Sequence, residues 1–260
     1  MNFKCQQEAI NQLKLLSDSD RHSILIEGAQ GCGKSYLVKQ YANMLNISDV
    51  QFVSPTVQNM KDSIDECLKS SNKIVLGVEN IDTGVLASAY TLLKFLEEPT
   101  ENVYVVVTCR NLNRVPDTII SRSSVINVSP PINIDINLYA ESKNANKFFQ
   151  LKSTKLWNCI KSFNDVDTIF KLSDSQINYI LNLTNLLGFR DTVTNIVWKL
   201  SHYEDGSELP VILAIQYIIS TTNCKHIKQA AIDCIKDLQF GRLGNQAVLS
   251  RFAFECKYCE

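Results

Sequence analysis

Residues 28–35 carry the types and spacing needed to hold a phosphate chain: Gly-Ala-Gln-Gly-Cys-Gly-Lys-Ser. The glycines let the backbone curl so that several N–H groups point at one anion. Lys34 can bring its charge to the β- and γ-phosphates, and Ser35 can place its hydroxyl on Mg²⁺. We therefore expect ATP and Mg²⁺ here, with contacts from Gly28, Ala29, Gln30, Gly31, Cys32, Gly33, Lys34, Ser35 and Tyr36.

An acidic residue, Glu79, follows the apolar stretch of residues 73–78. A hydrolytic phosphate site uses one acidic side chain for Mg²⁺ and a second carboxylate to orient the attacking water. Glu79 can serve magnesium together with Ser35, but Asn80 can hold a water only by hydrogen bonds and cannot act as a base. The pair predicts a metal site from Ser35 and Glu79 and leaves hydrolysis open.

A third polar position, Thr108, follows the apolar residues 103–107. In a parallel sheet it would lie beside the terminal phosphate, and Asn111 is a further candidate. Capping of an ordinary strand end explains both residues equally well.

These residues need an α/β scaffold to bring them together. Short apolar stretches predict strands at 23–27, 50–53, 73–78, 103–108 and 125–128. Helical spacing predicts helices between them, over 3–16, 35–45, 57–69, 86–96 and 117–121. The alternation favours a parallel sheet ending near residue 130. Beyond it, helices are expected over 134–150, 155–163, 166–170, 174–187, 191–202, 209–222, 225–238 and 246–255.

Composition narrows the class of protein. The net charge of −1 shows no basic surplus, so any DNA contact would be local or shared with partners. Nine scattered cysteines and a polar start favour free thiols and a cytoplasmic setting. The Cys256–Cys259 spacing lacks a second pair for a zinc site. No apolar run is long enough to span a membrane.

Two further segments, Leu-Leu-Lys-Phe-Leu-Glu-Glu-Pro at 92–99 and Val-Pro-Asp-Thr-Ile-Ile-Ser-Arg-Ser at 115–123, indicate a family. They resemble the LLKxLEEPP and LPxTIxSRC signatures of the DNA polymerase III delta-prime and ATPase subunits of bacterial clamp loaders. The order of the motifs is also that of the family. The resemblance covers residues 5–130 well and the rest of the chain more weakly.

The resemblance implies a parallel-sheet P-loop AAA+ domain over 1–130, followed by an all-helical lid over 131–188 and a collar over 189–260. It implies a subunit that binds ATP and, with other clamp-loader subunits, loads a sliding clamp onto primer–template DNA in the cytoplasm, a host's cytoplasm if the source is viral. Arg122 matches the arginine that the family projects into a neighbour's ATP site. Alternatively, Arg122 caps the helix that ends after Ile120.

Lys34, Glu79, Asn80 and Arg122 are thus the expected catalytic set, and an AAA+ ATPase active within an oligomer is the favoured interpretation. The departures keep two others open. Glu79-Asn80 stands where motor subunits have Asp-Glu, and their four-cysteine module is missing, which favours a non-hydrolysing delta-prime-like subunit. The third interpretation is a stand-alone P-loop ATPase, for which the Ser-Arg-Ser motif has no use.

Overall fold

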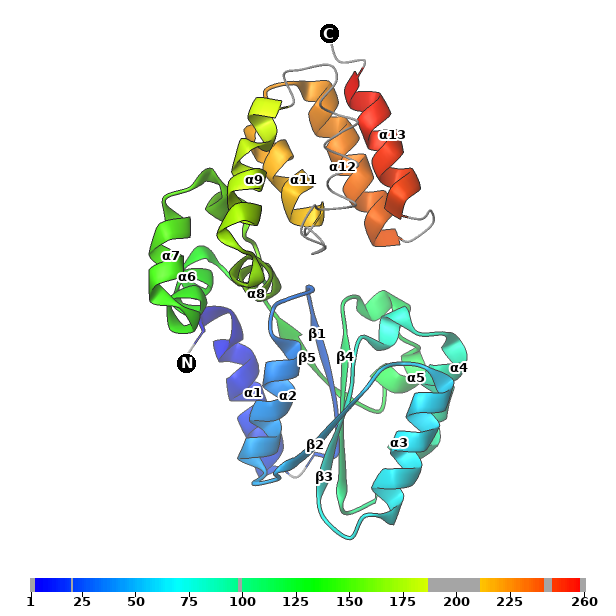
Figure 1. Ribbon diagram of the computed structural model, residues 1–260. Coiled ribbons are helices and arrows are strands. Elements are labelled where there is room, and N and C mark those ends of the chain that lie inside the picture. Colours follow the sequence, from blue (N-terminus) through cyan, green and yellow to red (C-terminus); the bar gives the residue numbers. More distant parts are fainter. Residues whose placement is uncertain (1–2, 20, 98–99, 187–210, 241–244, 258–260) are drawn as a thin grey trace. The chain divides into compact units, whose positions relative to one another are not determined.

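The computed structural model describes residues 3–19, 21–97, 100–186, 211–240 and 245–257. Its centre is a five-stranded parallel sheet in the order β2-β3-β4-β1-β5 (Figure 1). The strands are β1 Ser23–Gly28, β2 Asp49–Val53, β3 Ile74–Val78, β4 Val103–Cys109 and β5 Ser124–Val128. All five agree with the strands expected from the sequence to within one or two residues.

Alternation along the strands explains why helices cover both faces of the sheet. Successive strand side chains point to opposite faces, so Ile24 and Ile26 join one buried cluster while Leu25 joins another. Helices α1 (Gln7–Asp18) and α2 (Lys34–Met44) cover the first face. Helices α3 (Val57–Lys69), α4 (Leu86–Glu97) and α5 (Asp117–Ile120) cover the second.

The N-terminal segment is fastened to this unit. Residues 1–135 and 162–164 form one compact unit. The buried Asp135 carboxylate accepts hydrogen bonds from the backbone N–H groups of Lys4 (2.6 Å) and Cys5 (3.3 Å). The rings of Phe3 and Phe163 lie 4.8 Å apart. The start of the chain and residues 162–164 are therefore both held against the sheet unit.

The second compact unit, residues 136–161 and 165–260, is helical where it is described. Its buried residues form two clusters, one centred on α6 to α9 with α11 and the other on α11 to α13. The helices are α6 Asn133–Lys143, α7 Ala145–Lys152, α8 Phe163–Lys171, α9 Asp174–Leu186, α11 Val211–Thr221, α12 Lys225–Phe240 and α13 Asn245–Lys257.

Two expected helices of this unit were wrong in detail. The predicted helix 134–150 is broken at Asn144, whose side-chain oxygen accepts from the Lys147 N–H (3.0 Å) and caps α7. Asparagine favours such caps because its side chain replaces a backbone partner. The predicted helix 155–163 is a short 3₁₀ helix, Lys155–Cys159.

Ser173 forms a reciprocal capping pair with Gln176 at the start of α9. Its hydroxyl accepts from the Gln176 N–H (3.3 Å), and the Gln176 side chain accepts from the Ser173 N–H (2.8 Å). This exchange satisfies two donors at the helix start.

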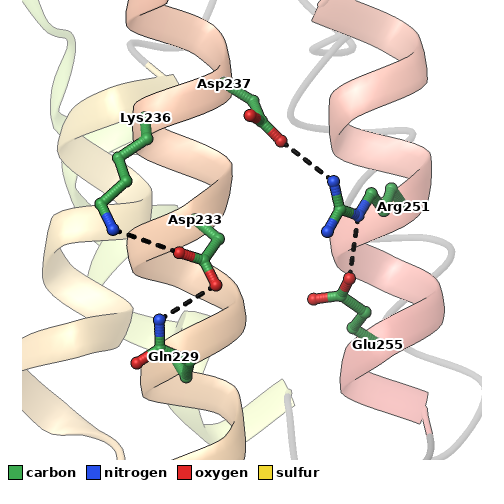
Figure 2. Close-up of polar contacts among 6 residues, drawn as sticks. All are labelled: Gln229, Asp233, Lys236, Asp237, Arg251 and Glu255. Carbon is green, nitrogen blue, oxygen red and sulfur yellow. Dashed lines mark hydrogen bonds and ion pairs between the residues drawn. The ribbon is translucent and has the colours of Figure 1, made fainter.

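Helices α12 and α13 are linked by exposed charges around their apolar contact (Figure 2). Arg251 on α13 pairs with Asp237 on α12 (3.2 Å) and with Glu255 on its own helix (2.9 Å). Asp233 accepts from Gln229 (3.0 Å) and pairs with Lys236 (3.4 Å). Exposed pairs contribute only ~0.2–1 kcal/mol each, so burial of the apolar residues carries most of this packing.

Several expected features lie outside the described residues. Helix 191–202 and the lid–collar boundary at 188–189 lie outside them, as does Cys259. Among the described residues, six cysteines are free thiols: Cys5, Cys32, Cys67, Cys109, Cys159 and Cys234. Cys224 is disulfide-bonded, which corrects the expectation that every thiol is free. Among the described residues, no helix has the length and apolar character to cross a membrane, and no cluster of three metal-binding side chains occurs.

Candidate nucleotide site

The loop between β1 and α2 owes its shape to two glycines with positive φ, Gly31 (+76°) and Gly33 (+90°). Residues other than glycine pay a steric penalty there. A Cβ on Gly33 would also lie 2.2 Å from Gln6 Nε2. The buried Gln6 amide donates to the Cys32 carbonyl (2.8 Å) and so holds the backbone of the loop. Nothing in the sequence pattern indicated this role for Gln6.

Lys34, the first residue of α2, lies inside the loop. Its Nζ donates to the backbone carbonyls of Gly28 (2.7 Å) and Ala29 (3.0 Å), and only 7% of its surface is exposed. Burial lowers the pKa of this ammonium group. The two carbonyls compensate the buried charge in part, so an incoming phosphate chain would exchange them for stronger anionic acceptors.

Ser35 and Glu79 meet across the ends of α2 and β3. The Ser35 hydroxyl donates to Glu79 Oε1 at 2.8 Å. Mg²⁺ in nucleotide sites takes one or two protein oxygens and completes its shell with phosphate and water. These adjacent hard oxygen ligands, a hydroxyl and a carboxylate, fit that donor set. The two residues are 44 positions apart in the sequence and lie within hydrogen-bond distance in the fold.

Asn80 and Thr108 are also adjacent, but through the backbone. The buried Thr108 hydroxyl accepts from the Asn80 N–H (2.9 Å) and donates to the Val78 carbonyl (3.3 Å). Asn80 takes a left-handed conformation (φ +48°) at the turn after β3. Thr108 thus ties the ends of β3 and β4 together. Asn111 instead caps a 3₁₀ turn by accepting from the Asn113 N–H (3.0 Å).

Arg110 is a cation near this site that the sequence analysis overlooked. It directly follows β4, and its backbone N–H donates to Asp82 Oδ1 (3.1 Å). After burial, its positive charge is a lesser cause of the lowered pKa of Lys34. Arg110 could have been found from its position, because it directly follows β4, the buried strand that pairs with β1.

Two buried thiols belong to the same edge of the sheet. Cys32 lies in the loop and Cys109 ends β4, and neither has exposed surface. Burial raises the pKa of both thiols, that of Cys109 to about 12. Both are therefore neutral, unreactive core residues at ordinary pH.

Arg122 lies away from these residues, at the opposite ends of the strands. It lines a cleft together with Ser23 and Ser124, the first residues of β1 and β5. The phosphate loop begins where β1 ends, about 17 Å away at ~3.3 Å per strand residue. Arg122 Nη1 donates to the Thr118 carbonyl (2.9 Å), so the alternative expectation of a helix-capping arginine describes its geometry in the free chain.

Known proteins resemble the chain in sequence and in fold. Residues 54–131 match the sequence model of the family described as DNA polymerase III, delta subunit. DNA polymerase III subunit gamma of Buchnera aphidicola is 31% identical over 103 residues, which are 38% of this chain and 28% of that protein. The chain thus spans little more than a quarter of that relative.

The fold resembles that of solved structures with little sequence identity. A DNA polymerase III gamma subunit-related protein of Thermotoga maritima aligns with a TM-score of 0.59 and 16% identity, over 96% of this chain and 99% of that one. The Holliday junction branch migration motor RuvB of the same organism aligns at 0.50 and 12%, over 94% and 80%. Both likenesses concern the fold, an α/β unit followed by helices. The family match over residues 54–131 and the polymerase III relative thus agree with the motifs in their similarity to DNA polymerase III subunits.

Proposed function

We propose that the chain is a clamp-loader subunit that binds Mg²⁺-ATP at the loop of residues 28–35. The observation that carries the proposal is the hydrogen bond between Ser35 and Glu79 beside the buried Lys34. A phosphate cradle, a cation and two metal ligands converge at the carboxyl edge of a parallel sheet, where ligands of this fold class bind.

Each residue has a distinct role in this site. Backbone N–H groups from Gly28 to Gly33 surround the phosphates, and the start of α2 adds its positive dipole end. Lys34 turns from the two loop carbonyls to the β- and γ-phosphates. Ser35 and Glu79 would hold Mg²⁺, which would neutralise charge on the phosphates.

Asn80 decides between hydrolysis and binding alone. A side-chain amide can orient a water but cannot take its proton, and Thr108 is engaged with the ends of β3 and β4. Turnover then depends on charge supplied by another subunit. The second candidate function is a non-hydrolysing delta-prime-like subunit that uses ATP to hold an assembly, and Glu79-Asn80 in place of Asp-Glu favours it. A stand-alone ATPase would leave Arg122 without a role.

Arg122 supports the assembly part of the proposal. Because it lies at the far ends of the strands from its own loop, it acts on a nucleotide only in trans, as an arginine finger on a neighbouring subunit. The helical collar (189–260), which follows the lid (131–188), would join the subunits into an open ring. That ring would place a sliding clamp on primer–template DNA in the cytoplasm.

ATP turnover of the purified chain, alone and with clamp, partner subunits and primed DNA, tests the proposal. We expect saturable Mg²⁺-ATP binding that Lys34→Ala abolishes and turnover that appears only with partners. Binding without turnover in every mixture would instead support the non-hydrolysing subunit. Absence of ATP binding by the wild-type chain would contradict both.

A further inference from the structure

The cleft at the amino ends of β1 and β5 is a second polar site of this unit. Its volume is about 750 Å³. Arginine, carboxylate and hydroxyl side chains share its wall, among them Arg21, Ser23, Glu97, Ser121, Arg122 and Ser123. Two guanidinium groups and several hydroxyls suit a polyanion, whereas the carboxylate of Glu97, the one acidic side chain among the described lining residues, opposes one.

Arg122 is engaged on two sides in the free chain. Its Nη2 pairs with Glu97 Oε1 at 2.7 Å, while Nη1 donates to the Thr118 carbonyl at 2.9 Å. The pair is partly exposed, with 36% of the arginine and 50% of the glutamate side chain accessible. Such pairs are weak in water and are screened by salt. An anion with several charges can therefore replace one carboxylate on the same guanidinium.

Arg21 lines the cleft, and hydrogen bonds hold its main chain in place. Its carbonyl accepts from the Tyr41 hydroxyl, and its N–H donates to the Leu16 carbonyl (3.1 Å). The next residue, His22, stacks on Tyr104 with ring centroids 4.4 Å apart. These contacts hold the main chain of Arg21, while the residue itself is exposed. The fold thus presents a second cation at the cleft that contains Arg122.

We propose that Glu97 is a displaceable counter-ion that masks Arg122 in the free subunit, and that Arg21 is a second cation for the anion that displaces it. The anion is the phosphate chain of a nucleotide held by a neighbouring subunit, so the inference rests on the proposed trans role of Arg122. Entry of the phosphates transfers Arg122 Nη2 from Glu97 to a phosphate oxygen and releases Glu97 to solvent. Arg21 then offsets the remaining negative charge.

Binding of inorganic tripolyphosphate, measured by calorimetry at low ionic strength, tests this arrangement. All variants carry Lys34→Ala, so that the chain's own loop does not dominate binding of the probe. Glu97→Gln should tighten binding about 3- to 10-fold, because a like charge is removed next to the site. Arg122→Gln and Arg21→Gln should each weaken it by a similar factor. Glu101→Gln, an exposed carboxylate outside the cleft lining, is the matched control and should change binding less than about 2-fold.

Equal affinity of the Glu97→Gln and Glu101→Gln chains would overturn the role of Glu97, and an unchanged affinity of Arg21→Gln would overturn that of Arg21. Thermal unfolding of each variant shows that the chain remains folded. Because Lys34→Ala removes the main cation of the chain's own loop from every variant, differences between these variants do not depend on ATP binding at residues 28–35. Failure of the proposed function would instead appear as loss of ATP binding by the wild-type chain.

Discussion

The carboxyl ends of the strands, here called the carboxyl edge, and their amino ends, the amino edge, hold charged groups in opposite ways. At the carboxyl edge, Lys34 is buried, Ser35 is bonded to Glu79, and the loop is packed against Gln6. At the amino edge, Arg122 is partly exposed and contacts the Thr118 carbonyl, the Ser121 hydroxyl and the exposed Glu97 carboxylate. The first edge is organised before any ligand arrives, whereas the second can exchange its partner. The proposed nucleotide site needs the former, and the proposed trans role of Arg122 needs the latter.

The largest effect is expected from Lys34→Ala, which removes the buried cation of the carboxyl edge. Charge-assisted hydrogen bonds contribute ~1.5–3 kcal/mol each, so losing two would cost about 4 kcal/mol of ATP binding, roughly 1000-fold. Fluorescence titration with a labelled ATP measures the change. Lys39→Ala, an exposed lysine of the same helix, serves as control and should bind as the wild type does.

Gly33→Ala tests whether the carboxyl edge is the more rigid one. The left-handed conformation costs ~1–2 kcal/mol for alanine, and the added Cβ would clash with the Gln6 amide. We expect the free energy of unfolding in urea to fall by about 3 kcal/mol. Ser121→Ala at the amino edge should change it by less than ~0.5 kcal/mol. Similar losses in both variants would erase the difference between the edges.

Alkaline pH should weaken the carboxyl edge through Cys109. Its folded-state pKa is raised from 9.0 to about 12, so the folded chain keeps a proton that the unfolded chain releases. Stability is therefore complete below pH 9 and falls as pH rises toward 12. One thiol contributes ~1.4 kcal/mol per pH unit, hence about 2 kcal/mol by pH 10.5. Urea unfolding of Cys109→Ala should show a shallower decline, and an unchanged slope would speak against this cause.

The bond between Ser35 and Glu79 should appear as a modest coupling in the free chain. A double-mutant cycle with Ser35→Ala and Glu79→Gln is expected to give about 1 kcal/mol in unfolding free energy. The same variants should reduce the dependence of ATP binding on Mg²⁺. Additive single effects on stability, together with unchanged Mg²⁺ dependence, would count against a shared site.

The smallest effect on stability is expected at the amino edge itself. Glu97→Gln removes a partly exposed ion pair, which contributes less than ~1 kcal/mol to folding. Its unfolding midpoint should lie close to that of the wild type even though tripolyphosphate binding changes. A loss above 2 kcal/mol would show that Glu97 is a structural contact and not a replaceable counter-ion.

The sheet and its loop could be predicted because their signals are local. Apolar strands, glycines at fixed spacing and a lysine at a helix start specify residues 23–35 with no distant partner. Tertiary contacts could not be predicted in this way. The bond from Gln6 to Cys32 spans 26 positions, and nothing in the sequence marks the glutamine for this role.

Helical periodicity also failed where capping competes with it. Residues 134–150 keep an apolar pattern through Asn144, yet the asparagine side chain starts a new helix by bonding to Lys147. Arg110 was overlooked for a different reason. A charged residue after a strand looks like an ordinary surface residue until the order of strands in the sheet is known. The position of Arg122 relative to the loop likewise follows from that order.

The proposal assigns the loop of residues 28–35 to the chain's own ATP and Arg122 to the ATP of a neighbouring subunit. The substitution Arg122→Ala tests this division most directly. Its own ATP affinity and its turnover with clamp, partner subunits and primed DNA are measured beside those of the wild type and Lys34→Ala. We predict ATP affinity within about 2-fold of wild type but loss of partner-stimulated turnover by roughly 10³-fold or more. An ATP affinity reduced as far as that of Lys34→Ala, or a stimulated turnover that does not change, would contradict the account.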